Sequence, residues 1–285
     1  MGFHSFWLPE NHFGGETSIP SPLMLLAGVA ARTRRIGLGS TSYLLPIRHP
    51  IQAAEEVAVL DRMSGGRVIL GIGRGIQKSM FTVFDIPESE KRKRFRQALD
   101  IMQNAWQGNP IAFDGDDPVH LAPLPVQKPW PSIWVAAFGP LALKQAGSLG
   151  LPYLASPMET LSSLQENYQR HSIAAREAGH EAVRIRPVMR TVFISQDSHL
   201  TQTVRDALTK EVISRNRIRR TSLFQSDPDD WVDQAALIGS PAYVSEKLQE
   251  YRDTLGLTHL IARGRIPGLS DADHLKSMEA LLKIL

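Results

Sequence analysis

One arginine and three glycines form the most distinctive group of residues that could do chemistry. Residues 68–70 are a continuous apolar run, which is typical of a strand buried on both faces, and residues 71–75 follow as Gly-Ile-Gly-Arg-Gly. Glycine lets a ligand or another backbone come close. Arg74 adds a permanent charge with five donors, which suits a phosphate. The alternative is a tight turn between a strand and a helix, with Arg74 at the surface.

A second group of polar residues lies near the start of the chain. Pro9 ends a short aromatic-rich stretch, and Glu10, Asn11 and His12 follow it in a loop of potentially catalytic groups. Metal-dependent hydrolysis would need His, Asp and Glu at several strand ends. Glu10, His12 and His49 are candidates, but the other expected strand ends are small or apolar. The sequence therefore predicts no metal site.

Other classes of function lack their motifs. Position 76 is isoleucine, so the glycine run does not complete a dinucleotide fingerprint, and the sequence has no P-loop and no nucleophile elbow. The chain has no cysteine, no apolar run long enough to span a membrane and no signal peptide. The basic runs 91–96 and 215–220 have no interleaved aromatic series to stack bases, so we expect no nucleic-acid partner. We expect a cytoplasmic protein.

The order of the expected elements indicates an α/β fold. Strands alternate with helices and short joints, which requires parallel strands and crossover connections. The pattern predicts seven strands, near residues 5, 39, 70, 135, 153, 190 and 261. An open doubly wound sheet or a closed barrel would fit, and the 285 residues suit a barrel, which takes about 250. We expect one domain over 1–285, with irregular segments near 109–131 and 218–235.

The expected strand ends are small, apolar or hydroxyl-bearing, which leaves room for a flat, bulky ligand that brings its own chemistry. Arg74 offers one anion site. A helix beginning at Gly139-Pro140 offers another, because the N–H groups of Phe138 and Gly139 lack acceptors within the helix. A planar cofactor with one phosphate, such as FMN, fits these features.

With these features in place, the sequence resembles the bacterial luciferase-like monooxygenases, a family of flavin-dependent barrel enzymes. The resemblance covers nearly the whole chain and is densest from residue 6 to residue 84. It is carried by the segments WLPENHF at 7–13, RRIGLG at 34–39, LPIRHP at 45–50, LDRMSGGR at 60–67, GIGRG at 71–75, VQKP at 126–129 and IGSP at 238–241. The resemblance implies a TIM (β/α)8 barrel that lacks its first βα unit, because residues 3–8 would be the second strand.

The resemblance also implies roles for particular residues. The phosphate-binding arginine corresponds to Arg74, with Gly73 beside it, and the phosphate-binding amides correspond to those of Phe138 and Gly139. The bend under the flavin ring, often a non-prolyl cis bond, corresponds to Thr41 and Ser42.

The catalytic histidine of the family falls on Asn11, which is a departure from the family's pattern, since asparagine cannot act as a general base at neutral pH. His12, the next residue, is the other catalytic candidate. A packing or hydrogen-bonding role for His12 stays open, and Glu10 could be a structural acceptor.

We therefore expect a monooxygenase that uses reduced FMN and molecular oxygen on an organic substrate. A deazaflavin-dependent hydride-transfer enzyme and a non-catalytic flavin-binding barrel are the alternatives. The resemblance further implies a homodimer formed through the helices at 21–32 and 51–63, and a separate flavin reductase as a possible partner.

Overall fold

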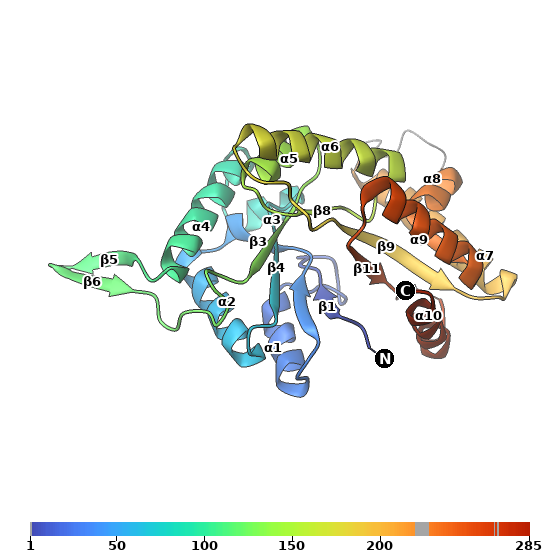
Figure 1. Ribbon diagram of the computed structural model, residues 1–285, viewed down its shortest axis with the longest axis horizontal. Helices are drawn as coiled ribbons and strands as arrows, with labels where there is room; N and C mark the ends of the chain where they lie inside the picture. Colours follow the sequence, from blue (N-terminus) through green and yellow to red (C-terminus); the bar gives the residue numbers. More distant parts are fainter. Residues whose placement is uncertain (1, 220–227, 265, 267) are drawn as a thin grey trace. The chain divides into compact units, whose positions relative to one another are not determined.

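The computed structural model describes residues 2–219, 228–264, 266 and 268–285. Contacts divide the chain into two compact units. We call residues 3–136 the N-terminal unit and residues 137–285 the C-terminal unit. Parallel strands alternate with helices in both, as the sequence predicted (Figure 1). The expectation of a single domain over 1–285 stays a prediction.

Four parallel strands form the sheet of the N-terminal unit, in the order β1 (Ser5–Leu8), β2 (Gly37–Ser40), β4 (Val68–Gly73) and β7 (Ser132–Ala136). The short β3 (Tyr43–Leu44) pairs with the end of β4. The helices are α1 (Pro22–Arg32), α2 (Pro50–Ser64), α3 (Lys78–Val83) and α4 (Lys91–Trp106), with 3-10 turns at Leu45–Ile47 and Glu88–Glu90.

Proline and glycine set the ends of these helices. Pro22 and Pro50 occupy first helical positions, where a missing N–H costs nothing. Gly65 ends α2 in the left-handed conformation, with φ of 69°. The buried face of α4 ends on Trp106, whose ring nitrogen donates to the Ala54 carbonyl of α2 at 3.0 Å. This packing fixes α2 and α4 against each other behind the sheet.

Gly39 is a close-packed position in the sheet. A methyl group added there would lie 2.1 Å from the ring of Trp7 on the neighbouring strand. We expect Gly39→Ala to lower the free energy of unfolding by about 1–3 kcal/mol, because Trp7 would have to leave its position. Gly28→Ala is the matched control. Its added methyl group meets nothing within 4 Å in α1, so it should stabilise by about 0.5–1 kcal/mol. Urea unfolding of both variants checks the pair, and equal effects would contradict it.

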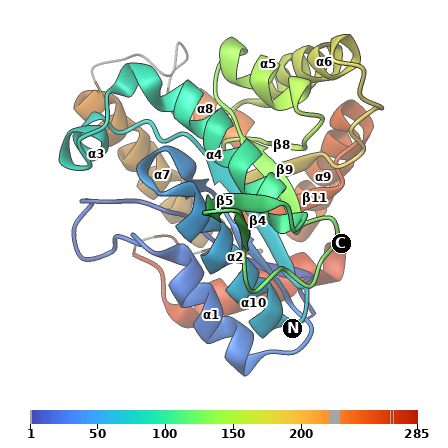
Figure 2. The ribbon, with the colours of Figure 1, turned by 90° about the vertical axis from the view of Figure 1, so that its left-hand side faces the viewer.

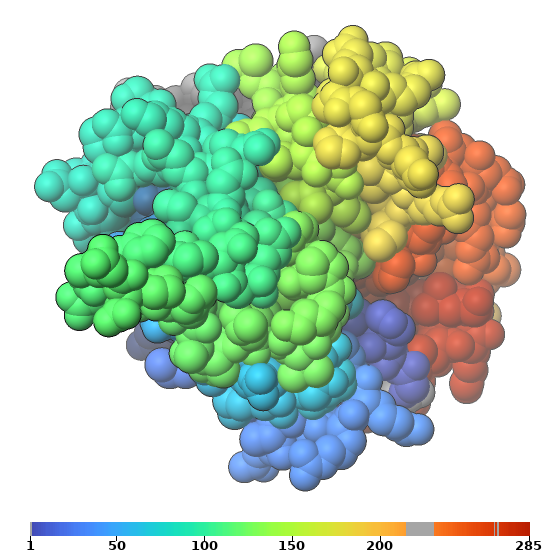
Figure 3. Space-filling model, turned by 60° about the vertical axis from the view of Figure 1, so that its left-hand side comes forward, coloured from blue at the N-terminus to red at the C-terminus, as the bar shows by residue number. Residues whose placement is uncertain are grey.

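Residues 110–120 form a β-hairpin instead of the irregular excursion that the sequence predicted. It consists of β5 (Pro110–Asp114) and β6 (Asp117–His120) and projects outward after the end of α4, toward the viewer in Figure 2 and at the surface in Figure 3. Its proline and aspartate residues are rare in strands, so the composition predicted a loop. The chain then returns past Asp61 of α2, whose buried carboxylate accepts hydrogen bonds from the backbone N–H groups of Val126 and Gln127 at 2.8 and 2.9 Å.

The C-terminal unit is built around β9 (Pro187–Ile194). The strand β10 (Ala236–Gly239) and the strand β11 (His259–Arg263) both pair with β9 in parallel, and Ala155, after β8 (Tyr153–Leu154), forms a bridge to Val188. The helices are α5 (Pro140–Ser148), α6 (Leu161–Glu177), α7 (Ser198–Arg219), α8 (Pro228–Ala235), α9 (Pro241–Leu255) and α10 (Asp271–Ile284).

Two sequence-based expectations are wrong in this unit. The strand β10 is a further parallel strand, so the count of seven is too low. The segment near 218–235 is helical from residue 228, as α8, while 220–227 lie outside the described residues. Trp231, which looks isolated in the sequence, packs in a buried cluster with Phe193 and Val204. Tertiary packing therefore orders a segment whose composition is polar. The missing first βα unit stays a prediction.

Within the described part of the chain, no helix combines the length and the apolar character needed to cross a membrane.

Candidate functional site

Glu10 is the centre of a buried polar network in the N-terminal unit. Its side chain is fully buried, and one oxygen accepts hydrogen bonds from Arg48 at 2.8 Å and contacts the His12 ring at 2.7 Å. The other oxygen accepts from the backbone N–H of Leu44 at 3.0 Å. Arg48 also donates to the Leu44 carbonyl and lies 4.0 Å from the centre of the Tyr43 ring. Glu10 thus joins the loop after β1 to the segment after β3.

Arg48 is the participant that sequence reasoning missed. It is 38 residues from Glu10 in sequence, and only the Leu-Pro-Ile-Arg-His-Pro segment marked its position. Nothing in that segment signals a carboxylate partner.

The His12 ring lies beside Glu10 and two aromatic side chains. Its Nε2 atom contacts Glu10 at 2.7 Å, and its ring lies edge-on to Phe84, with 5.3 Å between the ring centres. Phe13 lies 5.7 Å from the same ring and is about half exposed. The buried carboxylate fixes the orientation of the imidazole through this contact. The geometry therefore allows His12 to hold or move a proton.

Asn11 has a structural partner. Its side-chain oxygen accepts from the Ile19 N–H at 2.6 Å, and its own N–H donates to the Ile19 carbonyl at 3.1 Å. These two bonds close the loop between β1 and α1 around Asn11. The structure therefore separates the two catalytic candidates, since Asn11 is exposed and supports the loop, whereas His12 is buried beside Glu10.

The expected flavin-ring segment lies at the ends of β2 and β4. The Thr41–Ser42 peptide bond is cis. Ser42 lies directly over Gly73, where an added methyl group would be 2.1 Å from the serine hydroxyl oxygen. The absence of a side chain at position 73 thus leaves this strand end free for the Ser42 side chain. Thr41, Ser42 and Gly73 therefore lie together at this strand end, and their role in binding a flavin stays a prediction.

Arg74 follows β4 and is half-buried. Burial, and then the positive charge of Arg92 at the start of α4, lower the pKa of the Arg74 guanidinium from its ordinary value. Because the positive charges of Arg74 and Arg92 repel each other, an anion bound between or beside them would be stabilised. This environment is compatible with the anion site that the sequence predicts at Arg74, and that site stays a prediction.

Phe138 and Gly139 belong to the other unit. Gly139 is the N-cap of α5 with φ of 83°, and glycine has no side chain to cap the first turn. Phe138 is about half exposed. The helix start predicted from the sequence is present, and its free N–H groups suit an anion. The two predicted anion sites thus stand at the end of β4 in one unit and at the start of α5 in the other.

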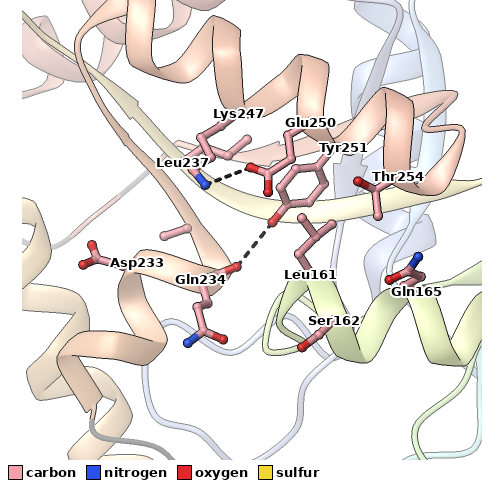
Figure 4. Close-up of a pocket in the computed structure, with 11 residues that line it drawn as sticks. Leu161, Ser162, Gln165, Asp233, Gln234, Leu237, Lys247, Glu250, Tyr251 and Thr254 are labelled. Carbon is pink, nitrogen blue, oxygen red and sulfur yellow. Dashed lines mark hydrogen bonds and ion pairs between the residues drawn. The ribbon is translucent and has the colours of Figure 1, made fainter.

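The C-terminal unit also contains a cavity of about 410 Å³ between α6, β10 and α9 (Figure 4). None of the predicted site residues lines it. Tyr251 points into it and donates to the Gln234 carbonyl at 3.4 Å, while Lys247 and Glu250 form an ion pair at its rim, at 2.8 Å. The described residues contain no group of three or more His, Cys, Asp or Glu that could hold a metal ion.

Comparison with known proteins places this arrangement in a family. The family model described as luciferase-like monooxygenase matches residues 1–258. The oxygenase component of flavin-dependent trigonelline monooxygenase from Acinetobacter baylyi is 30% identical over 182 residues, which are 62% of this chain and 50% of that protein. The chain spans about half the length of the curated relatives it matches.

Solved structures share the fold over almost the whole chain. The oxygenating constituent of 3,6-diketocamphane monooxygenase from Pseudomonas putida, in complex with FMN, has a TM-score of 0.82 at 24% identity and covers 98% of this chain and 87% of its own. Coenzyme F420-dependent tetrahydromethanopterin reductase from Methanopyrus kandleri has a TM-score of 0.73 at 20% identity, with coverage of 100% and 92%.

The fold class is therefore the luciferase-like TIM-barrel class that the sequence predicted. With a family model matched over residues 1–258, the chain belongs to the luciferase-like monooxygenases.

Proposed function

We propose that this protein is a flavin-dependent monooxygenase that uses reduced FMN and molecular oxygen on a small organic substrate. The observation that carries the proposal is Arg74, a half-buried arginine with a second cation nearby, at the carboxyl end of a parallel strand. Ligands of this class of fold bind at that end of the strands. The relatives named above act with flavins or a deazaflavin according to their names.

The residues around the end of β4 fit a phosphorylated flat cofactor. Arg74 would bind the phosphate, and Gly73 with Ser42 would form the floor on which the ring system lies. Behind them, Leu44, Met80 and Phe81 form a buried apolar cluster that would keep water from this wall. The backbone N–H groups of Phe138 and Gly139, at the start of α5, stay predicted phosphate donors. When bound, reduced FMN supplies the oxygen chemistry, so the chain needs few reactive side chains.

Arg74→Ala should weaken FMN binding roughly ten- to hundredfold, because a charge-assisted contact contributes about 1.5–3 kcal/mol. Flavin fluorescence titration measures the dissociation constant. Arg94→Ala is the matched control, since Arg94 is exposed on α4 and pairs with Glu90 at 2.9 Å. The control should bind FMN as the wild type does. Equal affinity in Arg74→Ala and Arg94→Ala would contradict the phosphate assignment.

Turnover tests the proposal as a whole. Oxygen consumption with reduced FMN and a panel of ketones, terpenes and aldehydes should exceed the uncoupled rate for at least one substrate. The absence of FMN binding in an absorbance titration would contradict the function. Binding without any coupled turnover would favour the non-catalytic alternative, which is consistent with the structural role of Asn11.

A deazaflavin is the second candidate cofactor, and one observation favours it. Arg92 adds a second positive charge near Arg74, as a longer anionic tail would require. Parallel titrations with FMN and coenzyme F420 distinguish the two. Tighter binding of F420, lost in Arg92→Ala while FMN binding is kept, would replace the monooxygenase proposal with hydride transfer.

We further propose a separate flavin reductase as the source of reduced FMN. The trigonelline relative is named as an oxygenase component, which implies a second protein for that enzyme. Coupled assays with an added NADH-dependent flavin reductase should sustain turnover, whereas NADH alone should not.

We also propose a homodimer through α1 and α2. These helices pack on each other and leave large apolar side chains exposed, among them Met24 at 75%, Leu25 at 52% and Met63 at 50%. An apolar patch of this kind on paired helices marks an interaction surface. Light scattering at micromolar concentration should give twice the chain mass, and Leu25→Glu should give a monomer. A wild-type monomer would contradict the proposal.

A further inference from the structure

The hairpin of β5 and β6 is an exposed projection of the N-terminal unit. Every residue from 112 to 120 is exposed, and Phe113 is 67% exposed. Figure 1 shows the hairpin extending away from the rest of its unit. A two-stranded hairpin is only marginally stable by itself in water. This one carries exposed Phe113 and Val119, one on each face of the ribbon, because Phe113 pairs with Pro118 and Val119 with Ala112. Both faces of the hairpin can therefore be covered by a partner.

The tip of the hairpin is acidic. It contains three aspartates within four residues, which we call the acidic tip: Asp114, Asp116 and Asp117. Asp114 and Asp117 stand directly opposite each other in the strand register, around Gly115 with φ of 61°. Like charges in directly opposite positions destabilise a hairpin. No ion pair involves these three carboxylates among the described residues. A partner with positive charges would be attracted to these aspartates and would offset the repulsion between them.

The same unit carries a surface of opposite charge. Three arginines lie within four residues where α1 ends, and we call them the arginine turn: Arg32, Arg34 and Arg35. All three are exposed and make no ion pair within the described residues. By contrast, Lys91, Arg94 and Arg96 on α4 pair with acidic neighbours on their own helix or just before it. The arginine turn is therefore the better match for the acidic tip.

The arginine turn is also held rigidly. Arg67 donates to the carbonyls of Ala30, Thr33 and Ile36 and to the Thr33 hydroxyl, at 2.6 to 3.3 Å. It thereby fixes the backbone between α1 and β2 and adds a fourth positive charge beneath it. A rigid partner surface loses little conformational entropy on binding. Exposed Leu25 lies two helical turns before Arg32 on α1, so an apolar contact can continue the charged one.

We propose that the hairpin is a dimerisation arm whose acidic tip binds the arginine turn of a second copy of this chain. The inference rests on the homodimer proposed above and adds a contact at its edge. In a two-fold dimer the contact occurs twice, since each copy provides one tip and one turn. Three charges on each side complement each other, and Phe113 or Val119 can cover the apolar end of the partner's α1.

Charge reversal with cross-complementation tests the arm. The tip variant carries Asp114→Lys, Asp116→Lys and Asp117→Lys, and the turn variant carries Arg32→Glu, Arg34→Glu and Arg35→Glu. Each variant alone would bring like charges together at both contacts, so its dimer dissociation constant should rise at least about tenfold. A one-to-one mixture restores opposite charges at both contacts, so the mixed dimer should recover an affinity within about threefold of the wild type.

Sedimentation equilibrium at low salt measures the dissociation constants, and native mass spectrometry identifies the mixed dimer. Lys93→Glu on α4 is the control and should leave the constant unchanged. If a triple variant does not fold by circular dichroism, the single reversals Asp116→Lys and Arg34→Glu repeat the mixing test with smaller shifts.

The outcomes separate the arm from the dimer. Two results would contradict the proposed arm while leaving the dimer in place. One is a wild-type dissociation constant in both reversed variants, and the other is a mixed dimer that binds no more tightly than the dimer of either variant alone. A wild type that stays monomeric at micromolar concentration would overturn both. Loss of affinity in each variant and its recovery on mixing would establish the arm.

Discussion

Glu10→Ala should lower the free energy of unfolding by about 3–5 kcal/mol, as expected when one member of a buried ion pair is removed. The Glu10 side chain is fully buried, and that of Arg48 is 17% exposed. Among the described residues, Arg48 without Glu10 keeps the Leu44 carbonyl and the Tyr43 ring as close partners, and the Leu44 N–H loses its acceptor. Because Arg48 retains those partners, the value should fall in the lower part of the range. Urea unfolding at pH 7 measures it.

Two further variants show whether the charge itself is responsible. Glu90→Ala removes an exposed partner of Arg94 and should change stability by about 0.5 kcal/mol or less. Replacing both partners, as Glu10→Gln with Arg48→Met, should cost less than the sum of the two single changes, because no buried charge is left uncompensated. An additive double variant would show that the two residues act independently.

Sequence periodicity located the strands and helices that determine the fold. The run at residues 68–70 predicted β4, and serine-proline and proline-led starts predicted α1 and α2. These elements have strong local signals, since the strand is continuously apolar and the helices carry caps and buried stripes. The position of Arg74 at the end of β4 follows directly from them.

The segments that the sequence did not predict depend on tertiary contacts. The strand β10 has four residues, and it is stabilised by pairing with β9, almost fifty residues earlier in the chain. The helix α8 buries Trp231 and Val232 in a cluster formed by β9 and α7. The hairpin carries proline and aspartate in both strands. Local propensity argues against strands there, and only pairing defines them.

The candidate site shows the same division between local and long-range information. The sequence located Glu10, His12, Ser42 and Gly73, but it did not show how they pair. Glu10 finds Arg48 across 38 residues, and Ser42 lies over Gly73 at a distance that only a glycine allows. The departure from the family's pattern at Asn11 also became interpretable only through its bonds to Ile19.

The Asn11 bonds lead to the expectation for catalysis. Asn11→Ala should leave the rate of coupled turnover within a few fold of the wild type, because Asn11 closes a loop and cannot act as a general base.

His12 can exchange a proton, which Asn11 cannot, and the Glu10 carboxylate lies 2.7 Å from its Nε2 atom. Within the described residues, the Nδ1 atom has no hydrogen-bond partner, and it is not one of the fully buried polar atoms. Nδ1 is thus the ring atom through which we expect a proton to be exchanged.

His12→Ala should therefore lower kcat by about a hundred- to ten-thousandfold, the usual contribution of general acid–base catalysis. The dissociation constant for FMN should stay within a few fold, because Arg74 and not His12 binds the phosphate. His12→Gln is the conservative control, since it can keep a hydrogen bond to Glu10 but cannot transfer a proton. If His12 only packs against Phe84, the glutamine variant should recover most of the activity and the pH profile of kcat should be unchanged. A glutamine variant as slow as the alanine variant, with one ionisation lost from that profile, would identify His12 as the group that exchanges the proton.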